Sequence, residues 1–468
     1  MDDLSTLLRL SVTEAAAAVR ERRVSPVTLV EAVLDGIART QGTLNAFVTV
    51  DADGARIAAR AAEAAVMRGD TLGPLHGVPF SVKDLTWTKG LRTTMGSKLF
   101  EQFVPQEDAV PVARLRAAGA ILVGKTTTPE FGHKPFTESP VSGISRNPWD
   151  LSRTPGGSSG GAAAAVAAGL GPLALGTDGG GSIRIPAACC GVVGLKPTLG
   201  RVPHIHAPDL FANNSYIGPI TRTVADARLA MSVIEGPDAR DPYAVAAIPP
   251  PAPRRLRVGW APRVGNALLD GEIETITGEA VKALGCAIEL VEIDFVSEED
   301  AFLVMLQSSL AARLGPRLAA ERASLSPSLT ETIERGLARS AAEVLDAAQR
   351  RTALYRKVVA LFDRIDVLAT PTISAPAPPT ELDPFAPFAI GNGAGAPGHI
   401  RATWYPYTYP FNLTGHPALT VPAGRTRAGL PVGLQLAGRW HEDHLLLDLA
   451  QRLEAARPWA AAWPPHAA

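Results

Sequence analysis

The stretch from Thr154 to Gly200 limits what this chain can fold into more than any other part. It holds 13 of the 43 glycines in about a tenth of the length. Glycine clusters occur where the backbone needs unusual dihedral angles or a close approach by another group. Two clusters also carry serine: GGSSGG at 156–161 and DGGGS at 178–182. We therefore expect two tight, serine-bearing turns.

The residues between the two clusters predict how they are joined. The small apolar run at 162–168 has no polar face, which favours a buried helix, and PLALGT at 172–177 predicts a short strand. Either cluster alone is equally compatible with an ordinary glycine-rich loop. As a pair they indicate a buried site, because consecutive backbone N–H groups before Ser182 suit an oxyanion beside an attacking hydroxyl.

Composition excludes several classes of protein. Hydrophobic residues make up 46% and charged residues 19%, which favours a large core over disorder. The net charge of −1 gives no reason to expect nucleic acid or a membrane surface as partner. Cys189, Cys190 and Cys286 form neither a disulfide framework nor a zinc spacing, so we expect no metal and no cofactor. No apolar run is long enough to span a bilayer.

The first ten residues, MDDLSTLLRL, are acidic and show neither the basic segment nor the cleavage site of a signal peptide. Together with the lack of a membrane span, this predicts a cytoplasmic protein. We expect it to be a monomer or a homodimer.

Lysine is rare: 8 lysines stand against 37 arginines, and six of the eight fall between positions 83 and 196. Arginine cannot give up its proton, whereas a buried lysine can. A lysine that must act as a neutral base is therefore one that arginine could not replace. Lys83 lies inside PFSVKDL at 79–85, which has strand character. The plainer interpretation of Lys83 is a lysine extending from an edge strand to solvent.

The rest of the chain alternates between helical and extended patterns, which favours a sheet covered by helices on both faces. Helices are expected from two capped starts near Ser11 and Ser25 and at 52–68, 108–118, 271–284, 298–320, 341–363 and 443–455. Strands are expected at 120–123, 255–261, 287–294 and 367–370, with a hairpin at 418–423 and 431–437. Residues 374–399 are rich in Pro and Gly and predict a surface loop. We expect one large α/β/α domain over residues 1–468.

Two familiar motifs occur in the wrong context. Residues 119–126, GAILVGKT, match the phosphate-loop expression, but its four variable residues look like a strand rather than a turn. GGSSGG satisfies G-x-S-x-G around Ser158 and Ser159, yet a proline-interrupted loop precedes it where a nucleophile elbow needs a strand. The sequence thus predicts neither an ATP site nor an α/β-hydrolase.

Several segments together resemble the amidase signature family of serine hydrolases. The signature core covers about 74–200 and includes HGVPFSVKDL at 76–85, TPGGSSGG at 154–161 and GTDGGGSIRIPAACCGVVGLKPT at 176–198. KTTTPEFG at 125–132, SRNPWDLSRTPGGSSGG at 145–161, GPITRTVADA at 218–227 and NLTGHPALTVPAG at 412–424 are also similar to this family. The resemblance implies the amidase signature fold, in which helices cover both faces of a mixed, twisted central sheet.

The resemblance also implies a Ser–cis-Ser–Lys triad. Ser182 would be the nucleophile, Ser158 the bridging serine after a cis peptide bond with Gly157, and Lys83 the base. The oxyanion hole would use the backbone N–H groups of Gly179, Gly180, Gly181 and Ser182. Asp178, Arg184 and Ser159 would brace the site.

Three residues depart from the family pattern without touching the triad. Gly179 stands where a residue with a side chain is usual, which predicts a more mobile oxyanion loop. Ala162 replaces a residue that is commonly polar. Cys189 replaces a phenylalanine, which predicts a roomier core nearby.

The resemblance predicts an amidase that hydrolyses carbon–nitrogen bonds to a carboxylic acid and an amine through a Ser182 acyl-enzyme. A carbamate (urethane) hydrolase would use the same groups. A glutamine-hydrolysing amidotransferase subunit is less favoured, because such subunits usually have SIRQP where Ile185 gives SIRIP. A non-catalytic binding protein does not explain why the triad is intact. A Ser–His–Asp enzyme stays formally open. However, His76, His133, His204 and His206 lie in no motif of such an enzyme and are expected to be loop or pocket-wall residues.

The substrate is expected to be a small amide or carbamate with an apolar or aromatic group. The stretches 133–144, 204–216 and 385–411 carry few charges and are predicted to form the pocket walls. Four aromatic residues of the last stretch, Trp404, Tyr405, Tyr407 and Tyr409, either line the pocket or simply pack the loop.

Overall fold

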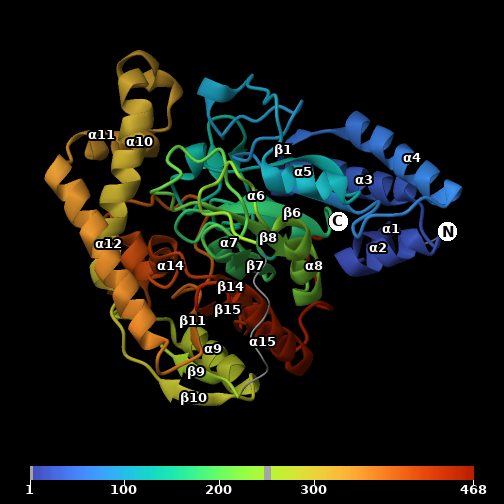
Figure 1. Cartoon of the computed structure of the whole chain (residues 1–468). Helices are drawn as coiled ribbons and strands as arrows, with labels where there is room; N and C mark the ends of the chain where they lie inside the picture. Colours follow the sequence, from blue (N-terminus) through green and yellow to red (C-terminus); the bar gives the residue numbers. More distant parts are fainter. Residues whose placement is uncertain (1–3, 247–254) are drawn as a thin grey trace.

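An 11-stranded sheet runs through the computed structural model, which describes residues 4–246 and 255–468 (Figure 1). From edge to edge its strands are β1 (Phe47–Val50), β3 (Ile121–Thr126), β2 (Pro79–Lys83), β6 (Leu173–Asp178), β8 (Tyr216–Thr221), β7 (Val193–Lys196), β14 (Ala418–Arg425), β15 (Pro431–Gly438), β11 (Val367–Pro371), β9 (Arg257–Trp260) and β10 (Ala287–Leu290). β2 is parallel to β3 and β6, and β9 is parallel to β10 and β11. The strands from β6 to β11 are antiparallel, so the predicted mixed sheet is confirmed.

Helices cover both faces of this sheet, as predicted. α7 (Arg184–Cys190) packs on β7, β14 and β15, and α15 (Asp443–Ala456) packs on β14 and β15 from the other side. Two glycines of β15 show which face of the sheet each helix covers. A Cβ on Gly433 would meet Ala188 of α7, whereas a Cβ on Gly438 would meet Leu446 of α15. These two positions are an odd number apart, so they face opposite sides of the strand.

The first helices begin where the sequence predicts. Ser11 caps α2 (Val12–Arg20) in a capping box with Glu14, and Ser25 caps α3 (Pro26–Leu44) with Pro26 in its first turn. α3 and α4 (Ala52–Arg68) lie over the β3 edge of the sheet. The remaining helices nearby are α1 (Leu4–Leu8), α5 (Val110–Ala117) and α8 (Val224–Ile234).

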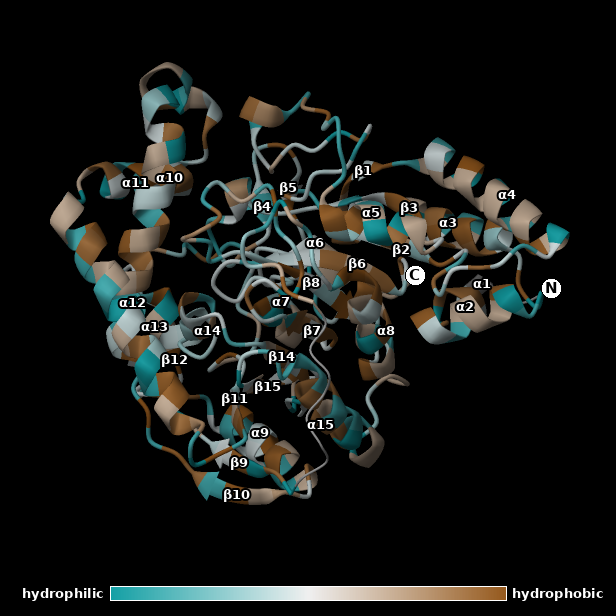
Figure 2. Ribbon diagram, viewed as in Figure 1, coloured by the Kyte–Doolittle hydropathy of each residue, from teal (hydrophilic) through white to brown (hydrophobic). Residues whose placement is uncertain are grey.

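A separate layer of long helices flanks the sheet. α10 (Glu299–Glu321) packs against α11 (Pro327–Leu337) and α12 (Ala341–Leu361), and α12 contacts α14 (Tyr409–Thr414). Figure 1 shows these helices in gold and orange, away from the blue N-terminal helices. Hydrophobic and hydrophilic residues alternate along α12 in Figure 2, because one face, with Leu354 and Val358, is buried. α9 (Gly271–Ala283) instead packs on β11, β14 and β15 of the sheet, and α13 (Ile400–Trp404) precedes α14 in the chain.

Most predicted elements are confirmed, and two are corrected. The strand expected at 287–294 ends at Leu290, where its pairing with β9 ends. The loop expected on the surface at 374–399 is partly interior: Ala375, Ala377 and Phe388 are buried. This segment also contains two short antiparallel strands, β12 (Ala389–Ile390) and β13 (Gly393–Ala394). A second short antiparallel pair is formed by β4 (Glu138–Ser139) and β5 (Gly143–Ile144).

Both rejected motifs lie in the local structure that the sequence predicted. Gly124, Lys125 and Thr126 are part of β3 rather than of a turn before a helix. No strand directly precedes Ser158 in this described segment, since residues 154–159 are irregular. Residues 1–3, which begin the acidic start of the chain, lie outside the described residues. Among the described helices, none has both the length and the hydropathy to cross a bilayer.

Candidate active site

The two serine-bearing turns are adjacent in space, as the sequence predicted. The first turn leads into α6 (Gly160–Ala167), which corresponds to the helix expected at 162–168, and β6 leads into the second. The backbone N–H of Ser159 donates to the carbonyl oxygen of Ser182 over 3.0 Å. Ser159 Oγ also donates to the carbonyl of Thr177 over 3.0 Å and accepts from the N–H of Thr177. Ser159 therefore holds the two turns together.

Lys83 is the last residue of β2 and reaches the first turn from inside the protein. Its Nζ lies 2.6 Å from Ser158 Oγ and 2.8 Å from Thr177 Oγ1, and it donates to the Thr177 carbonyl over 3.2 Å. The side chain is fully buried. Burial disfavours the charged ammonium and lowers the pKa of Lys83 well below its usual value, although Asp178 acts in the opposite direction. Lys83 is thus a buried amine aimed at a serine hydroxyl, not a lysine extending to solvent.

Ser158 follows a cis peptide bond with Gly157, as the resemblance implied. Ser158 itself is only 2% exposed, whereas Ser182 is partly exposed. The backbone of Gly132 stands directly against Ser158, because a Cβ placed on Gly132 would lie 3.0 Å from Ser158 Oγ. The order from interior to surface is therefore Lys83, Ser158 and then the turn that carries Ser182.

Asp178 organises the backbone of the second turn. Its Oδ1 accepts the N–H of Gly181 over 2.6 Å, and its Oδ2 accepts the N–H of Ile183 over 3.1 Å. The N–H of Gly181 is thus already bound to a carboxylate, which corrects the expectation that it faces an oxyanion. No hydrogen bond within the described part of the chain uses the N–H of Gly179, Gly180 or Ser182. These three donors are the ones left for a ligand.

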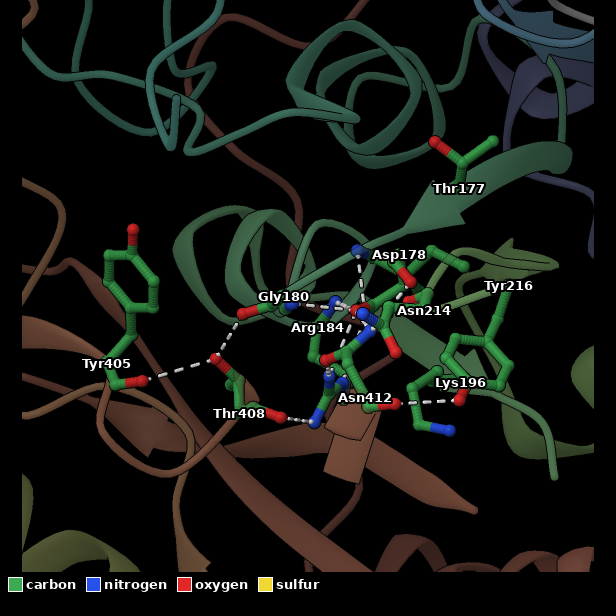
Figure 3. A network of polar contacts seen from close by, with 12 residues as sticks. Thr177, Asp178, Gly180, Arg184, Lys196, Asn214, Tyr216, Tyr405, Thr408 and Asn412 are labelled. Carbon is green, nitrogen blue, oxygen red and sulfur yellow. Dashed lines mark hydrogen bonds and ion pairs between the residues drawn. The ribbon is translucent and has the colours of Figure 1, made fainter. Parts of the chain in front are cut away.

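The carboxylate of Asp178 is fixed by Arg184 and Asn412 (Figure 3). Arg184 Nε and Nη2 each donate to it over 2.9 Å, and Asn412 Nδ2 donates over 2.9 Å. Burial alone would raise the pKa of Asp178, but Arg184 and Asn412 outweigh burial and hold the pKa well below its usual value. Asp178 is consequently a buried, ionised anchor for the turn.

Sequence reasoning missed the residues that hold Arg184. Its Nη1 donates to the Thr408 carbonyl and to Gln435 Oε1, both over 2.8 Å, and its Nη2 donates to Asn412 Oδ1 over 2.6 Å. Thr408 Oγ1 donates in turn to the carbonyl of Gly180 over 2.8 Å, as Figure 3 shows. Asn412 is the first residue of the segment NLTGHPALTVPAG, whose resemblance to the family was the only sequence feature that pointed to it. Thr408 and Gln435 lie outside the segments that resemble the family.

Two further lysines are as buried as Lys83, so lysine rarity alone does not identify the base. Lys125 donates to Thr88 Oγ1 over 2.9 Å and Thr93 Oγ1 over 2.8 Å, and burial lowers its pKa to about 8. Lys196 lies over the Tyr216 ring, 3.8 Å from its centre, and burial lowers its pKa well below the usual value. Only Lys83 among these three contacts a serine hydroxyl.

The candidate histidines have other partners. His133 contacts the Glu130 carbonyl and Ser328 Oγ, and His76 contacts the Ala62 carbonyl. His206 stacks on Trp87 with ring centres 4.3 Å apart, and burial lowers the pKa of His204 to about 4. None of the hydrogen bonds of the described histidines reaches Ser158 or Ser182. The geometry gives no support to a Ser–His–Asp arrangement.

The aromatic residues at 404–409 pack in the core. Trp404, Tyr405, Tyr407 and Tyr409 are each at most 3% exposed. Tyr407 donates to the Pro262 carbonyl and Tyr409 to the Phe295 carbonyl, while Trp404 stacks on Phe136. Of the two interpretations of these rings, the structure favours packing within the loop over lining a pocket.

Comparisons with known proteins agree with this geometry. A family model described as Amidase matches residues 28–447. The chain is 38% identical to an acylamidase of Rhodococcus erythropolis, covering 96% of each protein. It is 35% identical to one component of the glutamyl-tRNA(Gln) amidotransferase of Roseiflexus sp. strain RS-1, covering 98% of this chain and 99% of the relative.

Solved structures give the same result. A bacterial aryl acylamidase of the amidase signature family superposes with a TM-score of 0.88 at 31% identity, covering 96% of this chain and 97% of that one. Family model, curated relatives and solved structures thus agree over nearly the whole length. This chain belongs to the amidase signature family of amide-hydrolysing enzymes.

Proposed function

We propose that the protein cleaves a small linear amide to a carboxylic acid and an amine through an acyl-enzyme on Ser182. The observation that carries the proposal is the 2.6 Å contact between the buried Lys83 Nζ and Ser158 Oγ. A serine hydroxyl is a poor nucleophile until a base removes its proton. A lysine can act as that base only when it is neutral, and burial lowers the pKa of Lys83.

In this proposal the proton of Ser182 passes to Ser158 while Ser158 passes its own proton to Lys83. Ser182 Oγ forms a bond to the substrate carbonyl carbon, and the carbonyl oxygen becomes an oxyanion. The unused N–H groups of Gly179, Gly180 and Ser182 are the donors suited to that oxyanion. The tetrahedral intermediate then releases the amine, which receives the proton back along the same path. Water hydrolyses the acyl-enzyme by the reverse sequence.

Asp178, Arg184 and Ser159 act as positioning residues in this mechanism. The carboxylate of Asp178 accepts the N–H of Gly181 and thereby sets the turn that presents Gly179, Gly180 and Ser182. Fixed donors stabilise a developing charge without reorganising during the reaction. Arg184 and Ser159 hold Asp178 and the first turn in place.

Two related activities are kept as alternatives. A carbamate presents the same kind of carbonyl and would use the same groups. A glutamine-hydrolysing role is suggested by the amidotransferase relatives. Against the latter, Ile185 is buried and apolar where such proteins usually have glutamine.

The test is a panel of anilides, aliphatic amides, aryl carbamates and glutamine, assayed with the native chain and with Ser182→Ala. The proposal expects amine release from at least one amide, with no release above background by Ser182→Ala. Preferential cleavage of carbamates would favour the first alternative. Ammonia release from glutamine alone would favour the second, and undiminished activity in Ser182→Ala would overturn the mechanism.

A further inference from the structure

The peptide bond that joins Gly180 to Gly181 has no side chain on either side to limit its rotation. It lies between two of the three free donors in the chain, the N–H groups of Gly180 and Ser182. Both polar groups of this peptide bond are nevertheless held. The N–H of Gly181 donates to Asp178 Oδ1 over 2.6 Å, and the carbonyl oxygen of Gly180 accepts from Thr408 Oγ1 over 2.8 Å. The second contact comes from a residue that no step of the mechanism uses.

The Thr408 hydroxyl is bonded mainly to the Gly180 carbonyl. Two oxygen atoms 2.8 Å apart need a proton between them, and only the hydroxyl can supply it. The Tyr405 carbonyl is a second acceptor at 3.2 Å, as Figure 3 shows, and this longer contact is the weaker one. No other hydrogen bond within the described part of the chain reaches the Gly180 carbonyl. Loss of the hydroxyl therefore leaves this carbonyl without a donor from those residues.

Thr408 is itself fixed by the arginine that fixes Asp178. It is fully buried and directly precedes α14. Its carbonyl oxygen accepts from Arg184 Nη1 over 2.8 Å, while Nε and Nη2 of the same guanidinium donate to Asp178. A guanidinium presents its donors in a fixed fork. One planar group thus connects the two residues that hold the peptide bond.

Packing around the two glycines leaves little room for the peptide bond to turn. A Cβ on Gly181 would lie 2.4 Å from Thr408 Oγ1 and 2.8 Å from Ile185 Cδ1. A Cβ on Gly180 would lie 2.6 Å from Phe302 Cζ. The Thr408 hydroxyl can approach this closely only because position 181 has no side chain. Hydrogen bonds and packing therefore act together on this peptide bond.

We propose that Thr408 is a positioning residue for the oxyanion donors. Its hydroxyl holds the Gly180 carbonyl in one direction and thereby keeps the N–H of Gly180 directed at the substrate carbonyl. Without the hydroxyl, rotation about the glycine bonds would displace Gly180 and misdirect its N–H. Donors that are fixed before the reaction stabilise the developing charge without reorganising. This inference rests on the proposed function, because it takes these N–H groups as the oxyanion hole.

This role predicts a specific kinetic effect. The N–H groups bind the carbonyl oxygen most strongly when that oxygen carries a negative charge. Misdirected donors therefore slow the chemical step more than they weaken substrate binding, so kcat falls while KM changes little. A hydroxyl that only contributed to packing would change the unfolding temperature and leave kcat near its native value.

The test compares three variants of Thr408 on the amide that the native chain cleaves fastest. Thr408→Val keeps the shape and removes the hydroxyl, and Thr408→Ala removes it without placing a methyl group against the Gly180 carbonyl. Both should lower kcat about tenfold or more, with KM changed by less than about threefold. Complete removal of an oxyanion donor costs about 10²–10³, and a displaced donor should cost less. Thr408→Ser keeps the hydroxyl and should retain at least about a third of the native kcat.

Thr277→Val is the matched control. Thr277 in α9 is also fully buried, and its Oγ1 donates to a backbone carbonyl, that of Ile273, over 2.6 Å. The same exchange at this position should change kcat by less than about twofold. Unfolding temperatures establish which variants are folded. Native kcat in folded Thr408→Val or Thr408→Ala, or a loss in Thr408→Ser as large as theirs, would overturn the proposal.

Hydrogen exchange separates this inference from the proposed function, because it needs no substrate. Mass spectrometry follows a peptide over residues 178–184 in the native chain and in the variants. Its amides bound to Asp178, those of Gly181 and Ile183, should exchange about tenfold faster in Thr408→Val and at nearly the native rate in Thr408→Ser and Thr277→Val. That result supports the positioning of the turn by Thr408 even if the native chain cleaves no amide, in which case only the proposed function fails. Equal exchange in the native chain and Thr408→Val would contradict the positioning role, whatever the activity.

Discussion

Asp178 and Arg184 form a two-pronged ion pair in which neither side chain reaches solvent. Both hydrogen bonds measure 2.9 Å, and the carboxylate also accepts the N–H of Gly181. The pair thus joins the turn before Ser182 to α14 and β15, through the contacts of Arg184 with Asn412 and Gln435. Geometry at the candidate active site depends on segments more than 200 residues away in the chain.

Asp178→Asn should destabilise the protein strongly. Removing one charge leaves the other buried and unpaired, which typically costs about 3–5 kcal/mol. Urea unfolding monitored by circular dichroism measures the change. Asp70→Asn is the control, because its pair with Arg68 is exposed and should contribute less than about 1 kcal/mol. A similar small change for both variants would show that the buried pair does not anchor the fold.

Gly181→Ala should abolish most activity while Gly179→Ala should be tolerated. A Cβ on Gly181 would lie 2.4 Å from Thr408 Oγ1, and its φ of +123° disfavours any side chain. A Cβ on Gly179 would meet nothing within 4 Å. We expect at least about a hundredfold loss of kcat/KM for Gly181→Ala, because displacing this turn moves the N–H groups of Gly179 and Gly180, and misplaced oxyanion donors cost about that much. Gly179→Ala should change kcat/KM by less than about threefold. The reverse order of sensitivity would refute this description of the turn.

The stability of the protein should rise with pH in a window set partly by Lys125. Burial lowers the pKa of Lys125 to about 8 in the folded state, against about 10.4 for an unfolded chain. Between these values the unfolded chain binds more protons, so the free energy of unfolding increases with pH. Lys125→Met should be less stable overall and should show a shallower rise between about pH 8 and pH 10. An unchanged slope would mean that burial does not lower the pKa of Lys125.

A serine-directed sulfonyl fluoride should label Ser182. The reagent forms a covalent bond with an activated serine, and Ser182 is the partly exposed member of the proposed pair, whereas Ser158 is 2% exposed. Peptide mass spectrometry identifies the modified residue, and Ser182→Ala serves as the control. Labelling of Ser158 or Ser159 in the native chain would reverse the assignment of the nucleophile.

Local sequence patterns correctly predicted the helix and the strand that lie between the two serine-bearing turns. The apolar runs at 162–168 and 172–177 form α6 and β6, because their neighbours in sequence determine helix and strand there. The resemblance led from Lys83 to Ser158, although 75 residues separate them. Such a contact cannot be read from spacing, because it depends on the parallel pairing of β2 and β6.

Other features depend on contacts that no local pattern contains. The glycine run suggested three equivalent donors, but Asp178, three residues earlier, takes the N–H of Gly181. Aromatic residues such as those at 404–409 occur both in pocket walls and in cores, so composition does not distinguish the two. The hydroxyls of Tyr407 and Tyr409 donate to backbone carbonyls, which shows that these rings belong to the core. The lysine count did not distinguish Lys83 from Lys125 and Lys196, because all three are fully buried.

The most direct test of the account is kcat/KM of Lys83→Arg on any amide that the native enzyme cleaves. Arginine keeps the charge and much of the stem but does not deprotonate at any working pH. The account predicts a loss nearly as large as that of Lys83→Ala in a chain that remains folded. It also predicts that native activity falls as the pH drops through the lowered pKa of Lys83, because the protonated amine cannot accept the serine proton. More than about a tenth of native kcat/KM in folded Lys83→Arg would contradict the account and place the base on another residue.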